Sequence, residues 1–111
     1  MCIRDSDRTT HVEPLKGEEP PLGVISGITV RSSSVGPLHS GQVLILVTDG
    51  IEESMAPGGE LFGRSRVDEL IQSHGQLSSR ETVELLYREA RSFSRGEPQK
   101  DDMTAIALKV L

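Results

Sequence analysis

Apolar residues follow different patterns along this chain, and each pattern predicts a kind of element. Residues 43–47, VLILV, form a continuous aliphatic run. The run is too short for a helix of its own and has no polar alternation, so it predicts a strand over residues 42–48 that is covered on both faces. Residues 28–35, ITVRSSSV, and residues 103–110, MTAIALKV, alternate and contain several β-branched residues, which predicts two further strands.

Between the strands predicted over residues 42–48 and 103–110, apolar residues recur every three or four positions, which predicts two helices. The first is expected over residues 65–74, capped by Ser65 with Asp68 and ended by Gly75. The second is expected over residues 79–95.

The second predicted helix has the stronger start signal. Ser78 and Glu81 have the spacing of a capping box, and Gly96 follows the helix as a stop. The order strand, strand, helix, helix, strand indicates an α+β fold. The predicted buried stripe of the second helix consists of Val83, Leu86, Ala90 and Phe93.

Composition narrows the classes of function. The 111 residues amount to one domain at most, and a net charge of −5 without any cluster of Lys and Arg argues against nucleic-acid binding. Cys2 is the only cysteine, which excludes an internal disulfide and a cysteine-rich zinc site. The longest aliphatic run is far too short to span a bilayer, and no signal-peptide pattern is present. We therefore expect no membrane contact in this segment and a cytoplasmic location.

The first residues, MCIRDS, do not fit the patterns that follow them. They resemble the translated end of a sequencing read, and the alternative is a disordered native terminus. We therefore expect residues 1–8 to carry no function and take residues 9–111 as the domain. The many prolines and glycines of residues 7–27 predict loop and turn with at most a brief strand.

Carboxylates stand at the ends of two of the predicted strands. Asp49 directly follows the strand over residues 42–48, and Gly50 behind it permits a sharp turn and a close backbone approach. Asp101 and Asp102 precede the last strand. If the two strands are neighbours, Asp49 can meet Asp101 or Asp102 at one end of the sheet, where side chains project into a cleft.

Such an encounter of carboxylates requires a proton or a cation. Two unit charges about 4 Å apart repel each other by about 4 kcal/mol at an effective dielectric constant near 20. Oxygen ligands without a nearby histidine or cysteine suit a hard cation, Mg²⁺ or Mn²⁺, rather than zinc. The alternative is that the acids are ordinary turn formers. Glu52 and Glu53 either form a solvated acidic turn, or shape the cleft or pack against Arg66.

Three segments carry motifs in a fixed order. LILVTDGIEESMAPGGELFG is followed by an arginine and the two predicted helices, QKDDMTAIALKV ends the chain, and PPLGVISG lies upstream. Together they resemble the C-terminal half of a PPM-type, metal-dependent protein serine/threonine phosphatase, of the bacterial RsbU and sporulation-protein-E-like branch. That family has a strand ending in T-D-G, a glutamate just after it, a G-x-x-F-G-x-x-R segment and a terminal D-D-x-T strand. The matching residues are Thr48, Asp49, Gly50, Glu53, Gly59, Phe62, Gly63, Arg66, Asp101, Asp102 and Thr104.

The resemblance implies roles for a few of these residues. The T-D-G aspartate and the first aspartate of D-D-x-T bind one ion of a two-metal centre in such enzymes, which implies that Asp49 and Asp101 bind Mn²⁺ or Mg²⁺. A metal-activated water then hydrolyses the phosphoserine or phosphothreonine. Alternation along the last strand favours Asp102 over Asp101, because it places Asp102 on the same face as Thr104. The family match ranks Asp101 first, and Asp102 is the second candidate. The supporting loop consists of Thr48, Gly50 and Glu53.

The fold implied by the resemblance is a partial αββα sandwich, with one antiparallel sheet and the helical hairpin packed on one face. Two acids that the family also uses, an upstream aspartate and one in a D-x-x-G-H-G-like helix start, do not occur in this chain. We therefore expect residues 9–111 to be the C-terminal part of a phosphatase domain that is inactive alone. The other sheet would be missing, which leaves an apolar face of this sheet exposed.

Three functions stay open at this point. The first is part of an enzyme that dephosphorylates a partner protein in bacterial signalling, and the branch it resembles implies an anti-sigma-factor antagonist as that partner. The second is a non-catalytic, phosphatase-like binding module. The third is a small α+β interaction domain whose acids only form turns.

Overall fold

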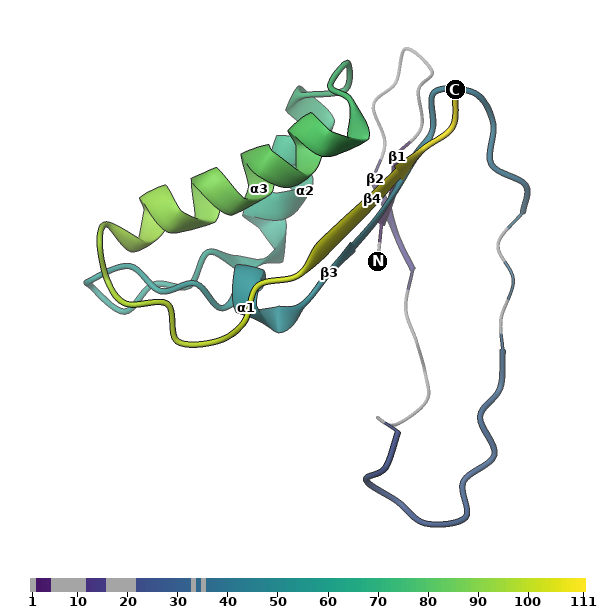
Figure 1. The fold of residues 1–111 in the computed structure, drawn as a ribbon, viewed down its shortest axis with the longest axis horizontal. Coiled ribbons are helices and arrows are strands. Elements are labelled where there is room, and N and C mark those ends of the chain that lie inside the picture. Colours follow the sequence, from purple (N-terminus) through teal and green to yellow (C-terminus); the bar gives the residue numbers. More distant parts are fainter. Residues whose placement is uncertain (1, 5–11, 16–21, 33, 35) are drawn as a thin grey trace.

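The helices of this chain lie on one side of an antiparallel sheet in the computed structural model (Figure 1). The structure describes residues 2–4, 12–15, 22–32, 34 and 36–111. Its elements are β1 (Cys2–Arg4), β2 (Val12–Pro14), β3 (Val43–Val47), α1 (Asp49–Glu52), α2 (Gly63–Ser73), α3 (Ser79–Ser94) and β4 (Ala105–Lys109).

The sheet has the strand order β2-β1-β3-β4, and each neighbouring pair is antiparallel. In the central pair, Val43 lies opposite Lys109 and Val47 lies opposite Ala105. The end of β3 therefore meets the beginning of β4. This arrangement confirms the α+β class and the predicted pairing of these two strands.

The N-terminal residues contribute to the sheet, contrary to our expectation. The sequence analysis left residues 1–8 out of the fold, whereas Cys2–Arg4 forms β1, between β2 and β3. With β1 on one edge and β4 on the other, β3 has hydrogen-bonding partners along both edges, as its unbroken aliphatic sequence favours.

The predicted strand over residues 28–35 is wrong for every residue of it that the structure describes. Residues 28–32 and 34 have no regular structure, and Val30 is 54% exposed. In Figure 1 the segment of residues 22–32 runs well apart from the sheet. β-branched residues stabilise a strand mainly by packing against cross-strand neighbours, and the described residues of this segment are paired with no strand.

Both predicted helices are present, with one wrong cap. α2 begins at Gly63, and its N-cap is Phe62, which makes no side-chain capping bond; the capping role predicted for Ser65 is therefore incorrect. Gly63 adopts a φ of +81°, which glycine tolerates, and this turn starts the helix two residues early. In α3, the capping box of Ser78 and Glu81 is confirmed.

The buried face of α3 is rotated relative to the predicted stripe. Leu86 and Ala90 are fully buried as expected, whereas Val83 and Phe93 are only half-buried. Polar Thr82 takes a buried position because its hydroxyl donates to the carbonyl of Ser78, 2.9 Å away. The buried residues of α3 are Thr82, Leu85, Leu86, Ala90 and Ser94.

The two faces of the sheet have different surroundings. Val43 and Ile45 are 3% and 1% exposed and pack in one core with the helices. On the other face Ile106 is 56% exposed and Leu108 is 51% exposed, although both are large and apolar. This exposed apolar face confirms the half-sandwich expectation. The core residues are Val12, Val43, Ile45, Ile51, Phe62, Val67, Ile71, Leu86 and Ala90.

In the described part of the chain, no helix has the length and apolar character needed to cross a membrane.

Candidate metal centre

Asp49 lies where β3 passes directly into a one-turn helix, α1. The sequence predicted a loop here. The helix forms because Ile51 is 1% exposed and anchors it in the core, and because the amide of Glu53 donates to the carbonyl of Asp49 at 2.7 Å. Ser54 closes the turn with a 2.9 Å bond from its hydroxyl to the carbonyl of Gly50. The side chain of Asp49 stays exposed at the sheet end.

Thr48 joins the end of β3 to the beginning of β4. Its amide donates to the carbonyl of Thr104 at 3.0 Å, and its hydroxyl oxygen accepts the amide of Thr104 at 2.9 Å. The same hydroxyl lies 3.5 Å from the carbonyl oxygen of Asp102. These bonds hold the two acidic segments against each other. The sequence analysis assigned Thr48 to the supporting loop but did not predict its bonds to Thr104. The signal for these bonds was that the T-D-G and D-D-x-T motifs each contain a threonine.

Gly50 brings the backbone of α1 onto the second acidic segment. A Cβ at this position would overlap the carbonyl oxygen of Asp102 and would lie 2.8 Å from its carbonyl carbon. The φ of Gly50 is ordinary, so the glycine is required by this close approach and not by a left-handed conformation. The predicted close backbone approach is therefore confirmed, with Asp102 as the group approached.

Asp101 and Asp102 lie in the connection that leads into β4. One carboxylate oxygen of Asp101 accepts the amide of Asp102 at 2.8 Å, and the backbone carbonyl of Asp101 accepts the side-chain amide of Gln99 at 2.9 Å. Both aspartates are exposed. Because β3 and β4 are antiparallel neighbours, Asp49, Asp101 and Asp102 all lie at the same end of the sheet.

The donor set suits a hard cation but supplies only part of a coordination shell. The candidate ligands are all carboxylates, which Mn²⁺ and Mg²⁺ prefer. Among the described residues, however, no group of three or more His, Cys, Asp and Glu side chains is placed to hold a metal. Joint ligation of a cation by Asp49 and Asp101, or by Asp102, therefore stays a prediction.

The acids after Asp49 do not pair with Arg66. Arg66 donates to the carbonyls of Leu61 and Phe62 at 3.0 and 2.9 Å, and its guanidinium lies 4.4 Å from the ring centre of Phe93. Its nearest carboxylate oxygen belongs to Glu60, at 3.9 Å. Glu52 lies 3.6 Å from Arg64 instead. Within the described residues, Glu52 thus pairs with Arg64, and no ion pair joins Glu52 or Glu53 to Arg66.

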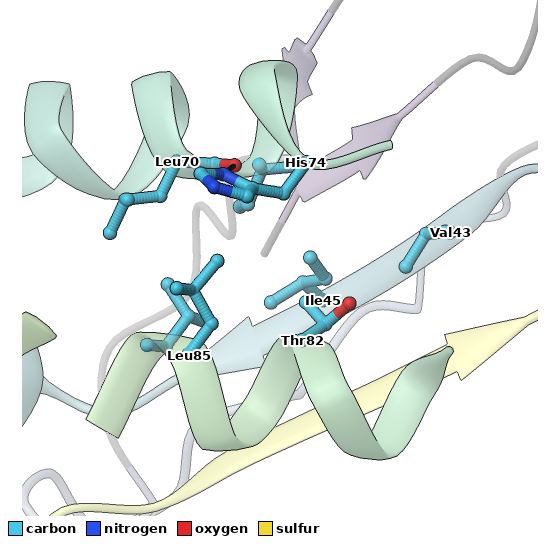
Figure 2. Close-up of a pocket in the computed structure, with 8 residues that line it drawn as sticks. Val43, Ile45, Leu70, His74, Thr82 and Leu85 are labelled. Carbon is cyan, nitrogen blue, oxygen red and sulfur yellow. Dashed lines mark hydrogen bonds between the residues drawn. The ribbon is translucent and has the colours of Figure 1, made fainter. Parts of the chain in front are cut away.

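A crevice between α2, α3 and β3 is too small to be a second site. Figure 2 shows the side chains of Leu70, His74, Thr82 and Leu85 converging over β3. The crevice has a volume of about 10 Å³, which is room for one water at most. His74 is the C-cap of α2, and its Nδ1 atom lies 3.0 Å from the carbonyl oxygen of Leu70.

The family model described as stage II sporulation protein E (SpoIIE) matches residues 1–111, the whole of the chain. The chain belongs to the SpoIIE family. This membership confirms the phosphatase-type resemblance that the T-D-G and D-D-x-T motifs indicated.

Solved structures agree with this membership. The SpoIIE-family chain is similar to the SiaA-PP2C domain of Pseudomonas aeruginosa, with a TM-score of 0.75 and 26% identity, over 90% of this chain and 39% of that one. It also has the fold of the phosphatase domain of SpoIIE from Bacillus subtilis, described as Mn presoaked. That match has a TM-score of 0.66 and 21% identity, over 98% of this chain and 45% of that one. The fold is thus part of a PP2C-type phosphatase fold.

A curated relative shows the same partial coverage. The chain is 31% identical over 96 residues to protein IcfG of Synechocystis sp., which is 85% of this chain and 14% of that protein. The SpoIIE-family chain therefore spans less than half the length of each of these similar proteins.

Proposed function

We propose that this chain is the C-terminal part of a PPM-type phosphatase domain that hydrolyses phosphoserine or phosphothreonine on a partner protein. The observation that carries the proposal is the bonding of Thr48 to Thr104, because it places Asp49 beside the segment of Asp101 and Asp102 at one sheet end. Family membership supports the reaction class.

The residues of this chain would have defined roles in such a domain. Asp49 and Asp101 would bind Mn²⁺ or Mg²⁺, with Asp102 as the second candidate for the position of Asp101. A bound divalent cation of this kind makes a water nucleophilic near neutral pH and neutralises charge on phosphoryl oxygens. Thr48 and Gly50 would hold the two carboxylate-bearing segments in register, so that a cation meets both without rearrangement of the backbone.

The substrate class follows from the branch that the motifs resemble. We propose a phosphorylated anti-sigma-factor antagonist in the bacterial cytoplasm as the partner, in an RsbU-like signalling role. The acidic character of the chain, with a net charge of −5, favours a protein partner over a nucleic acid.

A second candidate function has one observation in its favour. The described residues contain no group of three potential metal ligands, which is what a non-catalytic, phosphatase-like binding module would show. The two functions make different predictions for a complete domain. An enzyme would need further metal ligands from outside this chain, whereas a binding module would not.

The activity of the complete domain and of this chain tests the proposal. With Mn²⁺ and a phosphoserine peptide, we expect turnover by the complete domain and none by the 111-residue chain above a metal-only control. Asp49→Ala or Asp101→Ala should remove most of the activity of the complete domain, because each removes a ligand needed to bind the cation.

Two results would contradict the proposal in different ways. Wild-type turnover in both alanine variants would exclude these ligands while leaving the reaction class intact. An inactive complete domain that still binds phosphoprotein would favour the binding module. Calorimetric titration with Mn²⁺ separates loss of the ion from loss of the fold, since Asp49→Asn should bind the ion more weakly while its circular dichroism spectrum stays unchanged.

A further inference from the structure

A pocket of about 190 Å³ lies next to the candidate metal centre. Its walls come from α1 and the loop after it, from the C-terminal end of α3, and from the connection between α3 and β4. Asp101 lines this pocket and so does Gly50, the neighbour of Asp49, so the pocket and the candidate centre share a wall. Its remaining lining residues are Glu53, Ser54, Met55, Leu61, Arg91, Ser94, Pro98, Gln99, Lys100 and Met103.

Small side chains leave this space open. Ser54 and Ser94 are 6% and 3% exposed, and each hydroxyl is already used in a bond to a backbone carbonyl of its own segment. Neither side chain reaches across the pocket. Met55, Leu61 and Met103 also line the pocket and give it an apolar lining with two flexible thioethers that can adapt to an inserted group.

The rim of the pocket carries charges of both signs. Glu53 and Asp101 are acidic, and Arg91 and Lys100 are basic. Arg91 donates to the carbonyl of Glu97 at 3.2 Å, and the ammonium of Lys100 lies 3.6 Å from the sulfur of Met55. A mixed rim of this kind does not favour a purely anionic ligand such as free phosphate. It suits a peptide, whose N–H and C=O groups can bond to charges of both signs.

We propose that this pocket receives one apolar side chain of a bound peptide, of the size of leucine or methionine. Pockets for small-molecule ligands typically measure about 300–1,000 Å³, and this one is smaller. One aliphatic side chain inserted among Met55, Leu61 and Met103 would lose its contact with water, which is the main source of affinity in such anchors.

The proposal extends the proposed function, on which its substrate assignment rests. Because Asp101 belongs to both sites, a side chain in the pocket would place the neighbouring residues of the same peptide at the candidate metal centre. The pocket would then select phosphorylated residues that have an apolar residue close by in sequence.

Methionine methyl groups provide a direct measurement. The chain has three methionines, and two of them, Met55 and Met103, line the pocket. We would label the methionine methyls with ¹³C and titrate the 111-residue chain with a capped pentapeptide, Gly-Gly-Leu-Gly-Gly, at millimolar concentrations, and with Gly-Gly-Ala-Gly-Gly as the matched peptide. The leucine peptide should shift the Met55 and Met103 signals and bind about tenfold more tightly than the alanine peptide.

Two variants of the protein sharpen the test. Leu61→Ser removes an apolar wall at a residue that is 47% exposed, so it should fold normally and lose the shifts. Leu22→Ser is the control, because Leu22 is 79% exposed and lies outside the pocket; it should bind like wild type. Equal shifts with both peptides, unchanged binding by Leu61→Ser, or no shift of Met55 and Met103 would each overturn the proposal.

The pocket and the proposed function can fail separately. The titration uses an unphosphorylated peptide without Mn²⁺, so leucine-dependent shifts would support the pocket even if the complete domain had no phosphatase activity. An active domain whose KM for a leucine-containing phosphopeptide is unchanged by Leu61→Ser would retain the proposed function and refute the pocket as its peptide subsite.

Discussion

At the scale of single residues, the end of the sheet depends on how closely two backbones approach. Gly50 and the carbonyl of Asp102 are in a contact that leaves no room for a Cβ. Thr48 bonds to Thr104 through both its backbone and its side chain. These contacts involve only backbone atoms and the short side chain of Thr48. They position the exposed carboxylates, which take no part in the contacts themselves.

Replacing Gly50 by alanine should therefore destabilise the chain. The added methyl group must displace the backbone at Asp102, and overpacking of this kind costs about 1–3 kcal/mol. We expect thermal denaturation followed by circular dichroism to show a Tm at least about 5 °C lower than that of the wild type.

Gly58→Ala is the matched control for this substitution. Gly58 has an ordinary φ, and nothing lies within 4 Å of a Cβ built there. Its Tm should be unchanged or slightly raised. A Gly50→Ala protein as stable as Gly58→Ala would show that the two backbones do not approach as closely as described.

At the scale of elements, α3 is the longest helix and its start is defined by local chemistry. The Ser78 hydroxyl accepts the amide of Glu81 at 3.2 Å, and the Glu81 carboxylate accepts the amide of Ser78 at 3.4 Å. The first turn of a helix has amides without intrahelical partners, and this reciprocal pair satisfies two donors. α2 has no such pair and begins instead at the positive-φ Gly63.

Ser78→Ala should lower the free energy of unfolding by about 1 kcal/mol, because it removes the cap at the start of α3. Chemical denaturation with urea measures this difference. Ser92→Ala, at an exposed serine in the last turn of the same helix, is the control and should be neutral or slightly stabilising. Equal stability of the two variants would refute an energetic role for the capping box.

At the scale of the whole molecule, the sheet is covered on one side only. The exposed Ile106 and Leu108 lie opposite the half-buried Leu46 and Leu44 in the register of β3 and β4. Four large aliphatic side chains thus share one uncovered face. A contiguous apolar patch of this kind on a folded chain marks a surface that another layer covers. The chain spans 39% and 45% of the two similar phosphatase structures, which leaves length in such a domain for that layer.

The double substitution Ile106→Thr with Leu108→Thr should reduce self-association of the isolated chain and its binding of the dye ANS. Threonine keeps the β-branched shape that suits a strand while it removes apolar surface. Sedimentation velocity and ANS fluorescence measure the two effects. Tyr87→Ser, at a residue that is 51% exposed on α3, is the control and should change neither. Undiminished ANS binding in the double variant would show that the dye binds elsewhere.

The sequence by itself determined the elements whose signals are local. The aliphatic run of β3, the alternation of β4, the stripes of α2 and α3 and the Ser78 capping box all lie within short windows, and all of these elements are present. The sequence also placed each acidic segment at the end of a recognisable strand, but their meeting was conditional on β3 and β4 being neighbours.

The tertiary structure alone decided the rest, because the deciding partners are distant in sequence. β1 and β2 have three residues each, too few for any periodicity, and they are strands only through pairing with each other and with β3. Residues 28–32 have strand-like side chains but no neighbouring strand. The pocket beside Asp101 likewise forms only where α1, α3 and the segment before β4 converge. Hydrogen bonds between strands and packing between elements depend on proximity in space, and a local pattern of residues does not contain that information.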